Sequence, residues 1–306
     1  MKKLLTLILT LALALSLCAA GTAENASGMT VTAPSGAPAI ALAVLAAEQP
    51  ENYTFVAADT SAAAFAKAET DFIIAPVNAG AKLYKAGKST YKLAAMVSWG
   101  NLYIASQKEN LKAEDLNGAE ITLFGENTIN AAVVLYSLKE NGIEPAGVAY
   151  LAGAADTQSL LLSDANAIVV TAEPALTAAK IKNAAISSIP VNELYQKATG
   201  NEGYAQAGLF VRAETLEKDP EGVAAYLKQA EAACARCAED VDAVAEAAVK
   251  LEILPNVKVA AAAIPNCAIR FVSAPEAKEQ IEKTAEVDLS QFGGAVPADD
   301  FYYEAK

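Results

Sequence analysis

The feature that most constrains this fold is a strand, turn and helix rhythm that occurs six times along the chain. In the first unit, residues 30–33 form a short extended run, residues 34–37 form a turn, and Pro38 suits the first turn of a helix. The other strands are expected at residues 53–57, 72–77, 119–124, 148–151 and 167–171. Repeated units of this kind predict parallel strands joined by right-handed crossovers, and therefore an α/β fold.

An extended block at residues 92–106, broken by Gly100, separates the first three units from the last three. This arrangement favours two small α/β lobes over one large sheet. Beyond the sixth unit we expect a helix at residues 192–198, a strand at 204–212 and Ala-rich amphipathic helices from 214 to 252.

Composition limits the chemistry that the chain can perform. The 306 residues contain no histidine, so neither a Ser-His-Asp relay nor a Cys-His pair can form, and zinc loses its commonest nitrogen ligand. The formal net charge of −13, with no basic run outside the N-terminus, argues against nucleic-acid binding. An apolar content of 54% is ample for buried cores.

The N-terminus indicates export. Lys2 and Lys3 precede an apolar stretch at residues 4–17, the arrangement of a secretory signal peptide, which we expect to occupy residues 1–23. The alternative is lipid attachment at Cys18, although Leu17 stands where a lipobox normally has a small residue. Both alternatives predict an extracytoplasmic protein, in the periplasm or on the outer face of the cell membrane.

Three further cysteines stand at Cys234, Cys237 and Cys267. The CxxC pair lies in a helical segment without the strand and turn of a thioredoxin-type site, and three thiolates do not complete a four-cysteine zinc site. For an exported chain we favour a disulfide between Cys267 and one of the two helical cysteines. A reducing environment would leave all three as thiols.

The turns between strands and helices carry the candidate ligand-binding residues. In open parallel sheets, ligands bind beyond the carboxyl ends of the strands, where helix N-termini present free N–H groups. The first set of turns offers Ser35, Gly36, Ala37, Asp59, Thr60, Ser61 and Asn78, and the second offers Glu126, Asn127, Thr128, Asp156, Thr157 and Glu173. Each polar residue among them has an alternative role as a helix cap. Their few positive charges suit a small organic molecule better than a polyphosphate.

Trp99 is the only tryptophan and precedes Gly100 at the expected junction of the lobes. Its ring is a candidate for stacking on a ligand, and packing in the core is the alternative. Tyr103 and Tyr204 are further candidates of the same kind. Glu173, followed by Pro174, is a candidate contact for a ligand amine, with a structural role in the turn as its alternative.

Several segments resemble the type II periplasmic binding proteins of ABC importers, in the subgroup for nitrate, sulfonates, taurine and thiamine pyrimidine precursors. The matching segments are Pro34-Ser35-Gly36-Ala37-Pro38, Asp71-Phe72-Ile73-Ile74-Ala75-Pro76, Leu116-Asn117-Gly118-Ala119-Glu120-Ile121, residues 164–169 with Glu173-Pro174, residues 218–223, and Gly293-Gly294-Ala295-Val296-Pro297 with Phe301-Tyr302-Tyr303. Together they cover nearly all of the chain after the signal peptide.

This resemblance implies a two-lobed clamshell in which each lobe is a parallel sheet flanked by helices and two crossover strands form the hinge. Lobe 1 would comprise residues 29–100 and 205–306, and lobe 2 residues 101–204. The implied function is capture of a small-molecule solute for a permease with a cytoplasmic ATPase, by a monomer without a cofactor or metal. The binding turns contain no arginine, which favours a neutral or aromatic heterocyclic solute as much as an anion.

Two other functions are alternatives. One is an exported lyase or dehydratase that uses Glu126 or Glu173 as its acid or base. The other is a tethered sensory module that presents a ligand to a membrane receptor. The pyrimidine-precursor synthases of the same fold family consume an active-site histidine, so this chain is not one of them.

Overall fold

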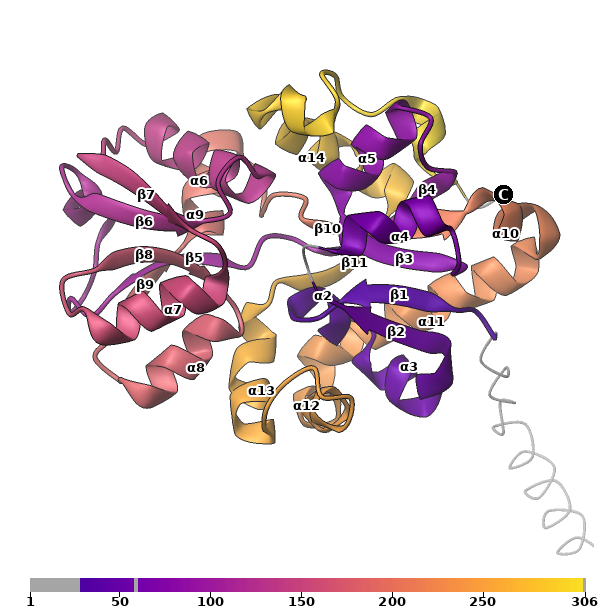
Figure 1. The fold of residues 1–306 in the computed structure, drawn as a ribbon, viewed down its shortest axis with the longest axis horizontal. Coiled ribbons are helices and arrows are strands. Elements are labelled where there is room, and N and C mark those ends of the chain that lie inside the picture. The colour runs from indigo at the N-terminus through magenta and orange to yellow at the C-terminus, as the bar shows by residue number, and fades with distance from the viewer. Residues whose placement is uncertain (1–27, 58–59, 305–306) are drawn as a thin grey trace, which may run out of the picture.

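The structure is a computed structural model that describes residues 28–57 and 60–304. The expected signal peptide at residues 1–23, Cys18 and Asp59 lie outside the described residues. Two separate sheets, each covered by helices on both faces, lie side by side along the long axis of the molecule (Figure 1). We call the larger sheet with its helices lobe 1 and the smaller one lobe 2. Within the described ranges, no helix is long and apolar enough to cross a membrane.

The sheet of lobe 1 has six strands in the order β11-β4-β10-β3-β1-β2. They are β1 (Val31–Pro34), β2 (Tyr53–Val56), β3 (Phe72–Pro76), β4 (Tyr91–Ser98), β10 (Ala207–Arg212) and β11 (Ile269–Ser273). The three strands predicted from the first set of units are parallel, whereas β10 runs antiparallel to β3 and β4, and β11 runs antiparallel to β4.

The sheet of lobe 2 has five strands in the order β7-β6-β8-β5-β9. They are β5 (Leu102–Ser106), β6 (Glu120–Phe124), β7 (Gly147–Leu151), β8 (Ile168–Ala172) and β9 (Ser187–Pro190). The second set of units again supplies the parallel strands, and β5 runs antiparallel to β8 and β9.

Both sheets are therefore mixed, with the expected parallel strands in each lobe and antiparallel strands added to them. The chain crosses between the lobes twice. The strand that follows each crossing pairs with a strand that ends at the junction, so the two run in opposite directions. Strand β5 leaves the junction while β8 returns to it, and β10 leaves while β3 returns, so each pair is antiparallel. The edge strands β9 and β11 were not predicted.

Helices cover both faces of each sheet (Figure 1). Lobe 1 carries α2 (Ala37–Ile40), α3 (Ala43–Glu48), α4 (Ser61–Lys67), α5 (Val77–Lys85), α10 (Ala213–Lys218), α11 (Pro220–Glu239), α12 (Val241–Lys250), α13 (Val257–Ala263) and α14 (Ala274–Val287), with 3-10 turns η1 (Pro50–Asn52), η4 (Ile264–Asn266), η5 (Leu289–Phe292) and η6 (Asp299–Phe301). Lobe 2 carries α6 (Ile129–Glu140), α7 (Ala154–Ser163), α8 (Ala175–Lys182), α9 (Val191–Thr199) and the turn η3 (Ala113–Leu116).

The Ala-rich helices behave as their amphipathic pattern predicts. The buried residues of α11 recur at helical spacing: Val223, Tyr226, Ala230, Ala233, Cys234 and Cys237. The helical stretch is interrupted at Asp219 and Asp240, which flank α11, and the Asp219 carboxylate accepts a hydrogen bond from the N–H of Gly222 at 2.9 Å. These helices pack against one face of the lobe 1 sheet and serve as scaffold.

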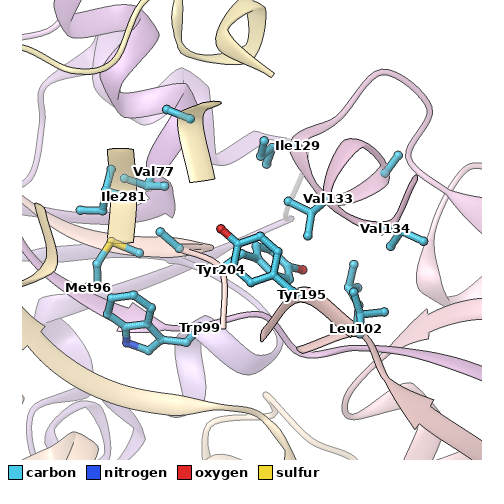
Figure 2. Close-up of a cluster of buried hydrophobic side chains, with 14 of the residues drawn as sticks. Val77, Met96, Trp99, Leu102, Ile129, Val133, Val134, Tyr195, Tyr204 and Ile281 are labelled. Carbon is cyan, nitrogen blue, oxygen red and sulfur yellow. The ribbon is translucent and has the colours of Figure 1, made fainter. Parts of the chain in front are cut away.

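One hydrophobic cluster runs through both lobes. It contains Val77, Met96 and Ile281 of lobe 1 together with Ile129 and Val133 of lobe 2. Figure 2 shows the rings of Tyr195 and Tyr204 between these two groups, with centroids 6.0 Å apart. Two other clusters are confined, one to lobe 1 and one to lobe 2. This cluster joins the lobes on the side of α5, α6 and α14.

The predicted disulfide does not form. Cys234, Cys237 and Cys267 are all buried free thiols in lobe 1. The first two point their sulfur atoms at the carbonyl oxygens of Ala41 and Ile40, at 3.6 and 3.8 Å. Burial raises the pKa of all three thiols, that of Cys237 to about 12, which keeps them protonated and unreactive.

Candidate functional site

The strand register brings the carboxyl ends of both parallel sets to the junction of the lobes. Pro76, at the end of β3, pairs with Ala207, the first residue of β10 after the return crossing. Ala172, at the end of β8, pairs with Leu102, the first residue of β5 after the outward crossing. The two crossings, residues 99–101 and 200–206, therefore lie beside the ends of β3 and β8, where strand-to-helix turns of both lobes begin.

A polar network ties the two crossings together. The Gln206 amide donates to Asn101 Oδ1 at 3.0 Å, and Asn101 Nδ2 donates to the carbonyl oxygen of Glu173 at 2.9 Å. Ser98 Oγ lies 3.3 Å from Gln206 Oε1, and the N–H of Val77 donates to the carbonyl oxygen of Gln206 at 2.9 Å. Because Ser98 and Asn101 are buried, these bonds fix the crossings to the ends of β3 and β8.

Two glycines let the crossings approach closely. Gly100 has φ of 76°, and a Cβ there would lie 2.3 Å from the ring of Tyr204. Gly203, on the other crossing, has φ of 136°, and a Cβ there would lie 2.7 Å from the carbonyl oxygen of Trp99. Asn192 Nδ2 donates to the carbonyl oxygens of Trp99 and Gly100 at 2.8 and 2.7 Å, so α9 holds the outward crossing in place.

Trp99 packs in the core of this junction. Its side chain is 2% exposed, and its indole N–H donates to the carbonyl oxygen of Arg270 at 2.9 Å. The Arg270 guanidinium lies 4.7 Å from the ring centroid and 3.7 Å from the Glu202 carboxylate. The packing alternative for Trp99 therefore describes this structure, because a cation already covers one face of the ring and the core surrounds the rest.

In lobe 1, the predicted turn residues differ in their exposure and in whether their polar atoms already have hydrogen-bond partners. Ser35 is exposed, Gly36 has φ of 105°, and Ala37 is buried at the start of α2. The Thr60 hydroxyl donates to the carbonyl oxygen of Ala57 at 2.8 Å and so closes its own turn. Asn78 is the second residue of α5, and its Oδ1 atom is buried without a hydrogen-bond partner. Asn78 is thus the lobe 1 candidate with an unused buried acceptor.

In lobe 2, the capping alternative holds for two residues. Thr128 Oγ1 accepts from the N–H of Ala131 at 3.3 Å at the start of α6, and Asp156 accepts from the N–H of Gly153 at 3.0 Å at the start of α7. Asn127 has φ of 59°, and its carbonyl oxygen accepts from Gln291 of lobe 1 at 2.9 Å. Glu126 is exposed beside it.

Glu173 is 4% exposed and lies at the carboxyl end of β8. Its two carboxylate oxygens accept from the N–H and the hydroxyl of Thr177, at 3.1 and 2.9 Å. Burial raises the pKa of this carboxyl, although the Thr177 hydrogen bonds and the charge of Lys180 oppose the rise. One oxygen thus satisfies a free N–H in the first turn of α8 and the other binds the Thr177 hydroxyl, an arrangement that disfavours Glu173 as the acid or base of a lyase.

The lobes touch on both sides of the junction. On one side Gln291 donates to Asn127, and on the other the Tyr103 hydroxyl donates to the carbonyl oxygen of Asn266 at 2.9 Å. Helix α13 of lobe 1 also packs against α8 of lobe 2, and α14 against α6. Five cavities of about 140 to 550 Å³ among the described residues are lined by lobe 1 side chains alone. No cluster of potential metal ligands occurs within residues 28–57 and 60–304.

Sequence reasoning missed three polar residues of the junction, namely Asn101, Asn192 and Gln206. Tyr204 was a candidate for stacking, and its buried hydroxyl donates to Asn130 at 3.1 Å. None of the three missed residues lies in a turn after a parallel strand, and only residues in such turns were selected as polar candidates. The break of extended character at Gly100 was the one available signal.

Comparisons with known proteins agree with this architecture. A scan against protein-family models finds no match, and a search of curated proteins finds none either. Among solved structures, an ABC transporter protein from Parabacteroides distasonis is 23% identical, covers 92% of this chain and 100% of its own, and gives a TM-score of 0.76.

Two sulfonate-binding proteins match as well. The periplasmic aliphatic sulphonate binding protein SsuA from Escherichia coli is 14% identical, with 91% of this chain and 92% of its own covered and a TM-score of 0.69. The alkanesulfonate-binding protein SsuA from Xanthomonas axonopodis pv. citri, bound to MOPS, is 14% identical, with 88% and 94% covered and a TM-score of 0.61. At these identities the likeness establishes the fold, which is that of the two-lobed type II periplasmic binding proteins.

Proposed function

We propose that this chain, which has the type II periplasmic-binding-protein fold, is the extracytoplasmic solute-binding component of an ABC import system. The observation that carries the proposal is the convergence of two sets of strand ends on one junction with two crossings. A solute held there contacts both lobes at once, so binding favours the arrangement in which they are together. The ABC transporter protein and the sulfonate-binding proteins of the same fold support this function.

The proposed partners follow from the function. A permease with a cytoplasmic ATPase would receive the solute, and the binding protein itself performs no catalysis. The engagement of both Glu173 oxygens by Thr177 supports a non-enzymatic role. We further propose that the solute site draws on Ser35 to Ala37 and Asn78 of lobe 1 and on Asn127 and Glu173 of lobe 2.

Mass spectrometry under non-denaturing conditions tests the proposal directly. We expect the protein without its signal peptide to carry a bound small molecule, or to bind one from a metabolite panel. At a free solute concentration one hundred times Kd, binding stabilises the folded protein by about 2.7 kcal/mol, measured as a rise in the midpoint of urea unfolding. If no molecule is bound and no metabolite shifts the transition, the protein does not capture solutes.

A pair of variants tests the location of the site. We expect Asn78→Ala and Asn127→Gly each to weaken solute binding by roughly threefold to tenfold, the loss of one hydrogen bond. Glycine is chosen at Asn127 because φ there is positive. Asn110→Gly is the matched control, since Asn110 is exposed in lobe 2 and also has positive φ. Calorimetric titration of all three proteins gives the result, and unchanged affinity in both site variants would exclude this location.

A further inference from the structure

Glu173 is a buried acid without a counter-ion among the described residues. Its side chain forms no salt bridge there, although it is 4% exposed. Neutral donors satisfy both oxygens, but a carboxylate accepts about four hydrogen bonds, so acceptor capacity remains. An ionised carboxyl removed from water is unfavourable until a cation pairs with it.

The groups that face Glu173 do not supply that cation. Burial raises the pKa of Glu173, and the charge of Lys180 on α8 opposes that rise only in part. The Lys180 ammonium donates to Ser188 Oγ at 2.8 Å and forms no salt bridge with Glu173. Across the sheet and the lobe interface, the groups within electrostatic reach are the Tyr103 phenol of β5 and the Cys267 thiol of lobe 1. Burial raises the pKa of both groups, and the charge of Glu173 adds to the rise. The charge of Glu193 also contributes to the raised pKa of Tyr103. A phenol, a thiol and a carboxyl cannot carry a positive charge, so these groups supply no cation.

The turns and crossings around the junction contain acidic residues and lack basic ones. The described turns after β1, β3, β6, β7 and β8 and the two crossings contain no lysine or arginine, whereas they contain Glu126, Glu173 and Glu202. Arg270 is the cation beside the crossings, and it is already engaged by the Trp99 ring and Glu202. These turns and crossings offer a sulfonate or nitrate no unpaired lysine or arginine.

We propose that the solute is a cation, a protonated or quaternary amine, whose positive charge pairs with Glu173 between the lobes. This inference rests on the proposed function and names the solute class of the same site. It departs from the sulfonate-binding proteins of this fold, whose solutes are anionic at the sulfonate group. Since a cation pairs with the ionised carboxyl, its affinity rises with pH through the titration of Glu173.

The experiment compares three groups of solutes on the purified protein. The cations are putrescine, spermidine, choline and thiamine, the anions are MOPS, methanesulfonate and nitrate, and the neutral solutes are glucose and glycerol. Thermal unfolding screens every solute, and calorimetry measures Kd for those that shift the transition. We expect stabilisation by at least one cation and by none of the anions.

Variants then test whether Glu173 is the residue that pairs with the cation. Glu173→Gln keeps an acceptor for the Thr177 N–H and is expected to weaken binding of the cation by on the order of 100-fold. Glu173→Asp retains the charge and is expected to recover part of the affinity. Glu140→Gln, an exposed position at the far end of α6, is the control and leaves the affinity unchanged. The unfolding midpoints of the unliganded variants separate lost binding from lost capping of α8.

The outcomes are distinct. Binding of an anion or a neutral solute alone overturns the cationic class and leaves solute capture intact. A cation that binds Glu173→Gln as tightly as the native protein overturns the assignment to Glu173. If no solute from any group binds and none copurifies, both the class and the proposed function fail.

Discussion

Replacing Gly100 by alanine is expected to destabilise the protein by about 2 to 5 kcal/mol. Positive φ at a residue with a Cβ costs roughly 1–2 kcal/mol, and forcing an atom into a packed site adds about 1–3 kcal/mol. Both terms apply, because φ is 76° and the new Cβ would lie 2.3 Å from the Tyr204 ring and 2.7 Å from Asn192 Oδ1. Tyr204 is fully buried and bonded to Asn130, so it has little room to yield.

Urea unfolding at equilibrium measures this loss. Gly118→Ala is the matched control, because Gly118 has φ of 68° and nothing lies within 4 Å of its would-be Cβ. The control therefore isolates the backbone term and should lose about 1–2 kcal/mol. Equal losses in the two variants would mean that the crossings are not packed against each other as described.

Trp99→Ala should cost about 3 to 5 kcal/mol, the usual range for removing a large aromatic side chain from a core. The ring is 2% exposed, its N–H satisfies the carbonyl oxygen of Arg270, and the Arg270 guanidinium stacks on it at 4.7 Å. The variant loses all of these contacts at the point where the lobes join. We therefore expect both a lower unfolding midpoint and weaker coupling between the lobes.

Circular dichroism follows this variant, since it has no tryptophan left to report by fluorescence. Trp99→Phe is the companion variant, and it should lose less because most of the buried apolar area remains. A loss below about 1 kcal/mol for Trp99→Ala would show that the ring is accessible, and the expectation that it stacks on the solute would then regain support.

The candidate turns could be predicted from the sequence because each is defined by residues close together in the chain. The turns after parallel strands carry Ser, Thr, Asn and Glu, and the strand register brings their ends to one junction. Several of these residues then proved to be caps, as Thr128 and Asp156 show. A cap and a ligand contact look the same in sequence, since both need a small polar side chain before a helix.

The residues that hold the junction together were beyond that reasoning. Asn101 and Gln206 bond to each other across 105 positions, and Trp99 bonds to Arg270 across 171. Such pairs cannot be predicted from hydrophobic periodicity, because each partner is an ordinary polar or aromatic residue in its own segment. The free thiols are a similar case. An exported chain favours a disulfide to Cys267, whereas Cys234 and Cys237 are buried with their sulfur atoms against the carbonyl oxygens of Ala41 and Ile40.

The sequence by itself determined the six strand and helix units, the two lobes and the direction of the parallel strands. These depend on side-chain periodicity and turn residues within about ten positions, where near neighbours decide the backbone conformation. Only the tertiary structure decided that both sheets are mixed, that Trp99 is core, and that Glu173 is buried without a cation. Burial and pairing depend on segments far apart in the chain, and they exist only once the two crossings have folded against each other.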